Sequence, residues 1–479
     1  MQLINDTMEM PGVGATYVSS GEQVRCWRHH SNLADGVPHE VLAFDIAVRD
    51  ADEALILQAM ELLFRRHESL RTFFREMEDE VRQCVIPYDP AVFSPFLYDL
   101  RGCEEQEAMY AEIQRIIDDH KRSMNRMEIP PLVKICIFRM AEKHIHVSLM
   151  IHHIISDLRS LNIIYDEVSN YYRQLKEGRP PQMQPLPFQL HDYAEWQRDW
   201  KKKNGDAVKR YWQKKLLCLG PCPDAEQLYR QYRLSSNLPA GETGECDGMT
   251  LDDLNGILSH GSLCSYSSHF DPGLYRQLVD FAKEHPYSIW SVMTAAVQML
   301  FYQMGQSRIL MVMPIDDRPL PRFESLIGYL TGAVYLQRQV IPDMEAGAFI
   351  RESYFDFLES ATNIIYDQNE LELDGAALRL HCRVFLDFVT SEATGRRPRL
   401  PGDNHIHRPL DGPGYYALKL SIQESAPGLC VFWKYNTVLY SAERIEFMAR
   451  TFETILESIC REPCQTIGRL PQKMTIDHC

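Results

Sequence analysis

Two adjacent histidines, His152 and His153, are the residues whose type and setting best suit acid–base chemistry. They end a β-favouring run, and Asp157 follows four residues after the second of them. An imidazole changes its charge near neutral pH, so a rigidly held histidine can take a proton from a nucleophile. A strand-to-helix corner gives that rigidity, because the elements on both sides fix the backbone. We therefore expect a general base or an orienting group here.

The same residues also fit a purely structural interpretation. A single histidine on a strand usually serves as a hydrogen-bonded structural residue, and spacing alone does not separate the two cases. Ser156 and Asp157 are residue types that cap helices, since their side chains accept hydrogen bonds from the free N–H groups of the first turn. The pattern therefore predicts where a helix begins and leaves the role of the histidines open.

The segments around these residues alternate as strands and helices do. Residues 132–140 and 144–152 are rich in β-favouring side chains, and the short stretch between them predicts a hairpin. Residues 161–175 have apolar side chains at helical spacing and stop at Gly178, with two prolines just beyond. The histidines are thus expected between a strand and a helix.

The rest of the chain repeats this alternation on both sides of a proline-rich segment. Residues 179–190 contain these prolines and form the best linker in the sequence. Further elements are predicted as helices at 51–64, 104–118, 192–217, 271–284, 288–303 and 442–460, and as strands at 308–314, 334–341, 383–389, 415–423 and 428–435. We therefore expect two α/β halves, with an irregular connection at 221–263.

The composition excludes several classes of protein. The 479 residues are 45% hydrophobic and 24% charged, as in globular proteins, and the formal net charge is −16. An acidic chain argues against nucleic acid or an anionic membrane as a partner, and no run of apolar residues is long enough to span a membrane. The first residues lack the basic and apolar regions of a secretory signal. We expect a cytoplasmic protein.

The cysteines and the other histidines form no recognisable metal motif. The 13 cysteines are scattered and odd in number, so we expect mostly buried thiols rather than disulfides. Structural zinc usually takes four nitrogen or sulfur ligands at close spacing. His144 and His146 alternate along a strand, and we expect nothing soft or acidic nearby. No phosphate-binding or dinucleotide fingerprint occurs. We predict no bound metal and no cofactor held by the chain itself.

A basic strip, residues 198–215, carries eight Lys or Arg residues against two Asp. Its simplest interpretation is the solvated face of a helix, and the alternative is a docking surface for an acidic protein. Trp196 and Trp200 lie four residues apart and are expected to pack rather than to bind a ligand.

The order of several short motifs resembles the condensation domains of nonribosomal peptide synthetases, which belong to the chloramphenicol acetyltransferase-like acyltransferases. The stretch HHIISDL at 152–158 is similar to the family's HHxxxDG motif. Further stretches match in the family's order: SGEQ at 20–23 with Trp27, RHESLRTF at 66–73, DYAEWQ at 192–197, MPIDDR at 313–318 with IGYLTG at 327–332 and Arg338, and KYNTVLY at 434–440. The similarity covers nearly the whole chain.

The resemblance implies a fold and a role for each motif residue. The implied fold is α/β, with two chloramphenicol acetyltransferase-like lobes in a V-shaped pseudo-dimer and a tunnel between them. Residues 1–180 would form the N-terminal lobe that carries the histidine motif, and 181–479 the C-terminal lobe. His153 would be the catalytic base or orienting group where two substrates meet, with His152 as a structural neighbour. Asp157 would pair with Arg318 from the other lobe and support the loop that carries the base.

Departures from the family pattern alter the surroundings of His153. Leu158 stands where the motif has glycine, and its side chain either narrows the tunnel or turns away from it. Asp317 replaces the glycine of the family's GR pair and adds a carboxylate near the expected ion pair. Gly332 replaces an asparagine, and the family's late HQDxPFE stretch has only a remnant, YDQN at 366–369.

By resemblance, the expected reaction transfers an acyl group from a carrier-protein thioester to an amine and forms an amide in nonribosomal peptide or other secondary-metabolite biosynthesis. The donor would arrive on the carrier's phosphopantetheine arm, and the acceptor is a small molecule or is itself carrier-bound. Two alternatives stay open: an ester-forming acyltransferase with a hydroxyl acceptor, and a catalytically silent binding or recruitment module. The chain lacks adenylation and carrier-protein motifs, and its ends favour a free-standing condensation enzyme.

Overall fold

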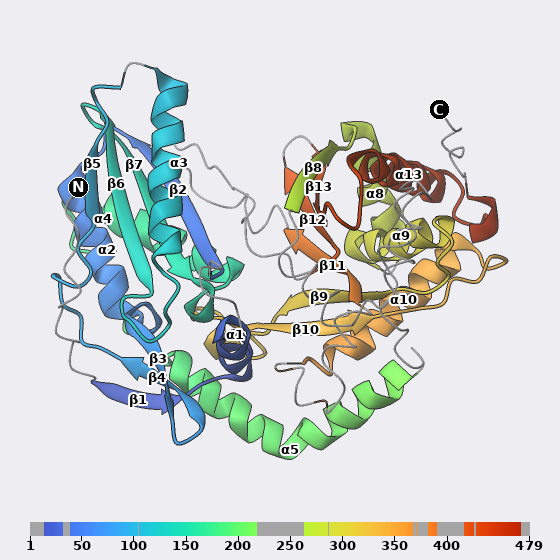
Figure 1. The fold of residues 1–479 in the computed structure, drawn as a ribbon, viewed down its shortest axis with the longest axis horizontal. Coiled ribbons are helices and arrows are strands. Elements are labelled where there is room, and N and C mark those ends of the chain that lie inside the picture. The colour runs from blue at the N-terminus through green and yellow to red at the C-terminus, as the bar shows by residue number, and fades with distance from the viewer. Residues whose placement is uncertain are drawn as a thin grey trace. The chain divides into compact units, whose positions relative to one another are not determined.

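The computed structural model describes residues 14–31, 39–103, 105–217, 263–285, 287–365, 367, 371, 382–389, 416–425 and 428–470. They form a mixed α/β fold with three sheets (Figure 1). The chain divides into two compact units, and more than one stretch builds each of them. Unit 1 contains the described residues up to Gly205 together with Asp316–Thr331, and unit 2 contains the remaining described residues.

Unit 1 holds two sheets and the helices that cover them. The four-stranded sheet has the order β2 (Val41–Arg49), β7 (His144–His152), β6 (Val133–Ala141) and β5 (Phe96–Asp99). The three-stranded antiparallel sheet has the order β1 (Ala15–Val18), β4 (Glu80–Val85) and β3 (Thr72–Met77). The helices are α1 (Gly21–Ser31), α2 (Glu53–Arg66), α3 (Gln106–Arg122) and α4 (Leu158–Lys176).

The strand that carries the histidines, β7, is central and buried. It pairs antiparallel with both β2 and β6, and α2 and α4 share one hydrophobic core with its side chains Val147, Leu149 and Ile151. Met150 belongs to a second core beneath α3. Because both faces of the strand are covered, its sequence is a nearly continuous apolar run. The predicted hairpin is confirmed, with a two-residue turn in which Lys143 has a positive φ of 70°.

Unit 2 is built on a six-stranded sheet. Its order is β10 (Thr331–Leu336), β9 (Leu310–Asp316), β11 (Cys382–Val389), β12 (Leu418–Ser425), β13 (Gly428–Asn436) and β8 (Leu263–His269). The helices of this unit are α8 (Pro272–Glu284), α9 (Ile289–Gln303), α10 (Ala346–Ala361) and α13 (Ala442–Arg461). Helix α9 is apolar nearly all round because it lies inside the core, between α10 and α13.

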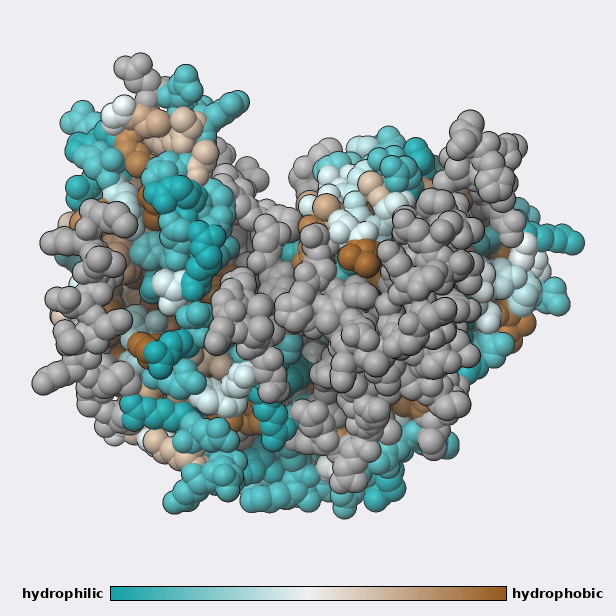
Figure 2. All heavy atoms as spheres, in the orientation of Figure 1, coloured by the Kyte–Doolittle hydropathy of each residue, from teal (hydrophilic) through white to brown (hydrophobic). Residues whose placement is uncertain are grey.

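Helix α5 (Leu190–Leu217) contributes residues to both units and follows the proline-rich segment, which contains no helix or strand. In Figure 2 the surface along α5 is mostly hydrophilic, in keeping with exposed Arg198, Lys202 and Lys203. Trp196 packs on Phe323, as expected of a packing residue. A docking role for the basic strip and the predicted lobe boundary at residue 180 stay predictions. Among the described residues, no helix is long and apolar enough to cross a membrane.

Candidate active site

His153 lies at the corner between β7 and α4. Strand β7 ends at His152, and His153–Ile155 form a short 3-10 turn, η2, before α4 begins at Leu158. The backbone N–H of His153 donates to the carbonyl oxygen of Glu40 at 2.9 Å, which ties the corner to the start of β2. The side chain of His153 is 18% exposed, whereas His152 is fully buried. Of the two histidines, only His153 is partly exposed.

The hydrogen bonds of His153 decide which ring nitrogen can act as a base. Its Nδ1 lies 2.6 Å from the carbonyl oxygen of Ser156. A carbonyl oxygen only accepts, so Nδ1 carries the proton and donates it, and the neutral ring keeps a lone pair on Nε2. The N–H of Ser156 donates back to the carbonyl oxygen of His153 at 3.2 Å, which holds the turn closed. This ring orientation is the one that a general base requires.

Tyr329, which sequence reasoning did not single out, packs against His153. The two ring centroids are 4.4 Å apart. The Tyr329 hydroxyl accepts a hydrogen bond from Arg25 at 2.8 Å, and Arg25 also donates to the carbonyl oxygen of Thr331 at 2.8 Å. Burial raises the pKa of Tyr329 to about 12, so the phenol stays neutral. Its place within the IGYLTG stretch is the sequence signal that could have found it.

His152 supports the corner from inside the core. Its Nδ1 accepts from the N–H of Ile154 at 3.1 Å, so its proton lies on Nε2, 3.0 Å from Nδ1 of His39. His30 completes a group of three packed rings, with centroid distances of 4.3 Å to His39 and 5.1 Å to His152. Burial lowers the pKa of all three histidines, to about 4 for His39, so the three rings are neutral at pH 7.

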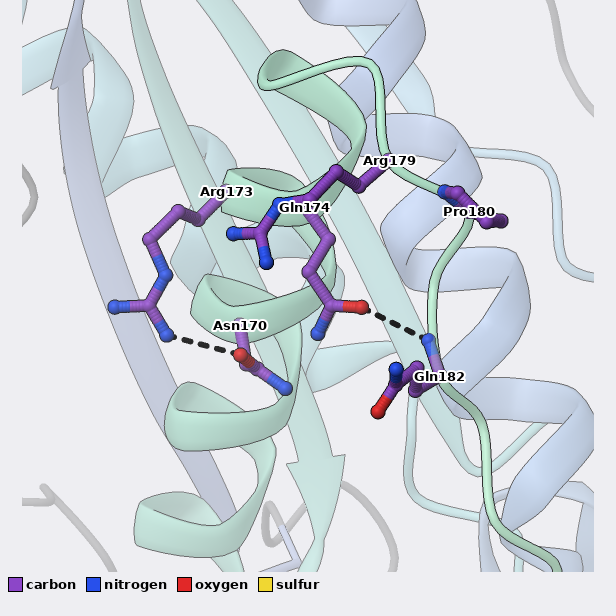
Figure 3. A pocket seen from close by; sticks show the side chains of 6 residues that line it. All are labelled: Asn170, Arg173, Gln174, Arg179, Pro180 and Gln182. Carbon is purple, nitrogen blue, oxygen red and sulfur yellow. Dashed lines mark hydrogen bonds between the residues drawn. The ribbon is translucent and has the colours of Figure 1, made fainter.

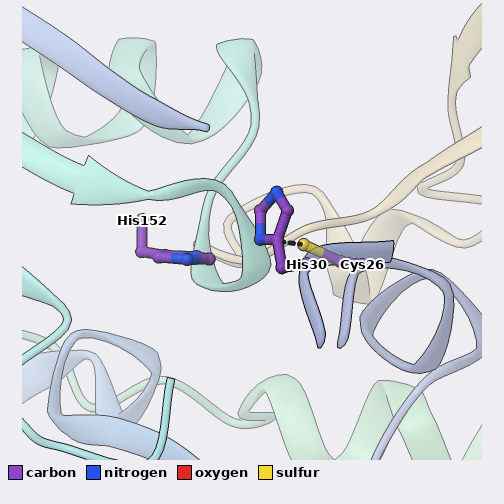
Figure 4. Close-up of side chains that lie close together, drawn as sticks. All are labelled: Cys26, His30 and His152. Atoms are coloured by element: carbon purple, nitrogen blue, oxygen red, sulfur yellow. Dashed lines mark hydrogen bonds between the residues drawn. The ribbon is translucent and has the colours of Figure 1, made fainter. Parts of the chain in front are cut away.

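Cys26, His30 and His152 form the group that comes nearest to a metal site within the described residues (Figure 4). One possible ligand atom of each lies within 4.8 Å of the others. However, Cys26 Sγ already contacts His30 Nδ1 at 3.7 Å, and both nitrogens of His152 are engaged in hydrogen bonds. Burial also raises the pKa of Cys26 well above its usual range, which disfavours the thiolate that a metal requires. The group fits packing around His152 better than metal binding, and the absence of a metal stays a prediction.

Asp157, the N-cap of α4, forms a buried ion pair with Arg318. The two terminal nitrogens of Arg318 donate to the two carboxylate oxygens at 3.0 and 3.1 Å, and both side chains are almost inaccessible to water. The carboxylate also accepts from the backbone N–H groups of Ser160, at 2.8 Å, and Leu330, at 3.2 Å. Both oxygens are therefore occupied, and Asp157 is suited to position the corner rather than to contact a substrate.

Charges around this pair determine its protonation. Burial alone would raise the pKa of Asp157, but the charge of Arg318 and hydrogen bonds from Arg318 and Ser160 outweigh it and hold the pKa below its usual value. Burial would lower the pKa of Arg318, and the carboxylates of Asp157 and Asp316 raise it instead. Both partners are therefore charged at neutral pH. Arg318 and Asp157 belong to the same compact unit, although 161 residues separate them in sequence.

Comparison with known proteins gives the chain its family. A sequence model of the family described as "Condensation domain" matches residues 14–473. The chain belongs to the condensation-domain family. It is 26% identical over 444 residues to one of the linear gramicidin synthase proteins of Brevibacillus parabrevis, an alignment that covers 86% of this chain and 5% of that protein. It is 32% identical over 216 residues to chondramide synthase of Chondromyces crocatus, covering 42% of this chain and 5% of that one. The chain thus spans a small part of these relatives.

Solved structures agree on the fold. The first condensation domain of the calcium-dependent antibiotic synthetase, in complex with a substrate analogue, superposes with a TM-score of 0.72 at 16% identity, covering 96% of this chain and 99% of that one. The X-domain from teicoplanin biosynthesis superposes with a TM-score of 0.71 at 16% identity, covering 97% and 99%. The predicted α/β condensation-domain fold is confirmed. The V-shaped arrangement and the tunnel stay predictions.

Two carboxylates, those of Asp316 and Asp317, directly precede Arg318 in the sequence. The carboxylate of Asp316 forms an ion pair with Arg318, beside Asp157. That Asp317 adds a further carboxylate near this pair stays a prediction. The carboxylate of Asp317 accepts from the hydroxyl of Tyr193 at 3.0 Å. The same hydroxyl lies 2.8 Å from Glu22, so stretches near residues 22, 193 and 317 converge on one buried network.

Leu158 and Gly332 are each explained by local packing. Leu158 is the first residue of α4, is partly buried and packs against the hydrophobic core of unit 1. Whether it narrows a tunnel stays a prediction. At Gly332 a Cβ atom would meet Cγ2 of Ile364 at 2.1 Å, so a larger residue does not fit unless Ile364 moves. Of the late remnant at 366–369, the described part is Asp367, which is buried.

The RHESLRTF motif anchors α4. Arg66 forms an ion pair with Glu167 of α4, and Nε2 of His67 lies 3.0 Å from the other oxygen of that carboxylate. Arg71 donates to the carbonyl oxygen of Phe64 at 2.9 Å. The family motif thus holds the helix whose N-terminus carries Asp157.

A cavity of about 370 Å³ elsewhere in unit 1 is not the candidate site (Figure 3). It is lined by residues of the C-terminal half of α4 and the segment after it, which are Asn170, Arg173, Gln174, Arg179, Pro180 and Gln182. Hydrogen bonds join several of these residues to one another, and none of the six is a nucleophile or a base. On the central sheet, His146 lies 3.2 Å from buried Asp45, so our expectation that no acidic residue is near His146 is wrong.

Proposed function

We propose that this chain transfers an acyl group from a carrier-protein thioester to an amine, with His153 as the general base. The observation that carries the proposal is the tautomer of His153. Its Nδ1–H is committed to the Ser156 carbonyl, and the remaining lone pair on Nε2 belongs to a partly exposed side chain. Membership in the condensation-domain family supports the reaction class.

The reaction forms a C–N bond and breaks a C–S bond. The neutral amine attacks the thioester carbonyl carbon, and Nε2 of His153 takes the proton that the nitrogen loses. The tetrahedral intermediate then expels the thiolate of the phosphopantetheine arm, and the imidazolium returns its proton to this leaving group. The products are an amide and a free thiol, and the histidine is restored.

Asp157 and Arg318 act in this scheme as positioning residues. Their ion pair fixes the N-terminus of α4, and therefore the turn that carries both His153 and the Ser156 carbonyl. Tyr329 packs on the ring and limits its rotation.

A second candidate is a binding module without catalysis. A solved complex of the X-domain and OxyB from teicoplanin biosynthesis, with a TM-score of 0.72 at 17% identity, has this fold in a protein–protein assembly. The lone pair that the hydrogen bond at Nδ1 leaves on Nε2 of partly exposed His153 favours the enzyme, since a recruitment surface does not need a base.

The proposal is tested with an acyl-loaded carrier protein, a panel of amines and alcohols, and mass spectrometry of the products. We expect amides from the wild type and a loss of product of about 10²–10⁴-fold in His153→Ala. Esters in place of amides would indicate the hydroxyl-acceptor enzyme. Carrier binding without any product, from both proteins, would contradict the proposal and favour the binding module.

A further inference from the structure

Glu40 places a carboxylate beside the reactive nitrogen of His153. It directly precedes β2, whose first residue, Val41, pairs with His152 of β7, and its carbonyl oxygen accepts from the His153 N–H at 2.9 Å. The two residues are thus fixed to each other through the backbone. An oxygen of the Glu40 carboxylate lies 4.0 Å from Nε2 of His153, and the two side chains are 32% and 18% exposed.

The distance of 4.0 Å is too long for a hydrogen bond. Nε2 of the neutral ring and the carboxylate are both acceptors, so in this tautomer neither can donate to the other. Among the described residues, the carboxylate of Glu40 has His153 as its ion contact and receives no hydrogen bond. Two acceptors therefore lie 4.0 Å apart, a separation at which a single nitrogen beside them can donate to both.

A protonated primary amine matches this space better than an alcohol does. An ammonium group has three N–H donors and a positive charge, whereas a hydroxyl has one donor and no charge. A nitrogen that lies at hydrogen-bond distance from both Nε2 and the carboxylate fits the separation of these two acceptors. The carboxylate and an ammonium group attract each other as opposite charges as well, whereas an alcohol offers the carboxylate only an uncharged O–H donor.

Three titratable groups near Glu40 are uncharged and therefore do not neutralise its carboxylate. Burial raises the pKa of the Cys26 thiol most, and the charge of Glu40 raises it further. Burial and, to a smaller extent, Glu40 also raise the pKa of the Tyr329 phenol, so both groups stay protonated. Nε2 of His30 accepts a hydrogen bond from the backbone N–H of Glu40 at 3.5 Å, and burial keeps this ring neutral. Arg25 donates to the Tyr329 hydroxyl at 2.8 Å.

We propose that Glu40 and His153 together bind the acceptor as a protonated primary amine, and that Glu40 makes the site select amines over alcohols. This inference rests on the proposed function, because it names the acceptor class of the same site. Glu40 takes the first proton of the ammonium group and releases it to solvent, and the resulting amine attacks the thioester. His153 takes the second proton and returns it to the thiolate. The sum is one ammonium and one thioester converted to one amide, one thiol and one proton.

The test measures binding without acyl transfer, so that it does not depend on turnover. The protein is labelled with ¹³C-histidine, the ring signals of His153 are assigned by their loss in His153→Ala, and n-butylammonium chloride or n-butanol is titrated. We expect butylammonium to shift the His153 signals in the wild type and to bind about 10- to 100-fold more weakly to Glu40→Gln. Glu142→Gln, an exposed glutamate in the β6–β7 turn, is the matched control and should bind as the wild type does.

Equal binding of butylammonium to the wild type and Glu40→Gln would overturn the inference, and so would equal binding of butanol and butylammonium to the wild type. A failure of the proposed function would give a different pattern, in which butylammonium binds in a Glu40-dependent way and no acyl transfer occurs. Transfer to amines that is unaffected by Glu40→Gln would leave the proposed function standing and refute the role of Glu40.

Discussion

The two adjacent histidines have different environments because successive residues at the end of a strand point in opposite directions. His152 points into the core, where its ring donates to His39 and accepts from a backbone N–H. His153 stays accessible, and the Ser156 carbonyl selects its tautomer. The choice of His153 as the candidate base came from a family motif. The carbonyl that prepares it comes from a backbone turn, which residue types alone do not reveal.

The buried pair of Asp157 and Arg318 should stabilise the fold as a unit. Asp157→Asn leaves the Arg318 charge buried without a full partner, and we expect a loss of about 3–5 kcal/mol in the free energy of unfolding. Denaturant unfolding of Asp157→Asn, Arg318→Met and the double variant measures the coupling. We expect the double variant to lose less than the sum of the two single variants.

Glu112→Gln serves as the control for this cycle. Glu112 pairs with Arg115 on the solvent side of α3, and its removal should leave unfolding unchanged within error. Additive losses at Asp157 and Arg318 would show that the two residues act independently and would contradict a coupled pair.

At the scale of elements, β6, β7, α4 and α5 were predicted close to their observed bounds. Their apolar periodicity is strong, and Gly178 and the following prolines mark the end of α4. Strand β2 and helix α1 were not predicted, yet Glu40 directly precedes β2 and Arg25 lies on α1. These contacts join residues more than 100 positions apart, so local patterns could not reveal them.

The start of β10 gives a prediction about a departure from the family motif. Gly332→Asn should destabilise the protein by about 1–3 kcal/mol, because its Cβ would overlap Cγ2 of Ile364. Thermal unfolding of Gly332→Asn, Ile364→Ala and the double variant checks this. The double variant should lose less stability than the sum of the losses in the two single variants.

A full additive loss in the double variant would mean that Ile364 is not the obstacle. Gly205→Asn is the matched control, since a Cβ atom at Gly205 of α5 meets no atom within 4 Å. Its cost should reflect helix propensity alone.

At the scale of the whole molecule, the buried histidines should make stability fall as the pH falls. Burial lowers the pKa of His30 and His152 in the folded state below their ordinary 6.5, so below pH 6.5 the unfolded chain binds protons that the folded chain does not. Their contribution is complete above pH 6.5 and is lost progressively below it. Each should lower the free energy of unfolding by about 1.4 kcal/mol per pH unit in this range.

Denaturant unfolding between pH 7 and 5 measures this slope. His30→Gln should reduce the slope by about one proton. An unchanged slope in His30→Gln would contradict the neutral, buried state of this ring. The pKa of Asp157 is lowered in the folded protein, so its protonation at more acidic pH should reduce the free energy of unfolding further.

The composition and motif order were enough to predict the fold class of the whole chain, because apolar periodicity and family motifs extend along most of its length. The grouping of Asp316–Thr331 with the first 205 residues was not predictable. In sequence this segment lies between two strands of unit 2, and only its tertiary contacts assign it to unit 1. This grouping brings Arg318 and Tyr329 to the site.

The most direct test of the central claim is the single-turnover rate of acyl transfer from a loaded carrier protein, compared between the wild type and His153→Ala. Circular dichroism and thermal unfolding of the variant should first show an intact fold, which the partly exposed position of His153 permits. We predict a rate lower by about 10²–10⁴-fold. A rate within threefold of the wild type would mean that His153 is not the base and would contradict the proposed mechanism.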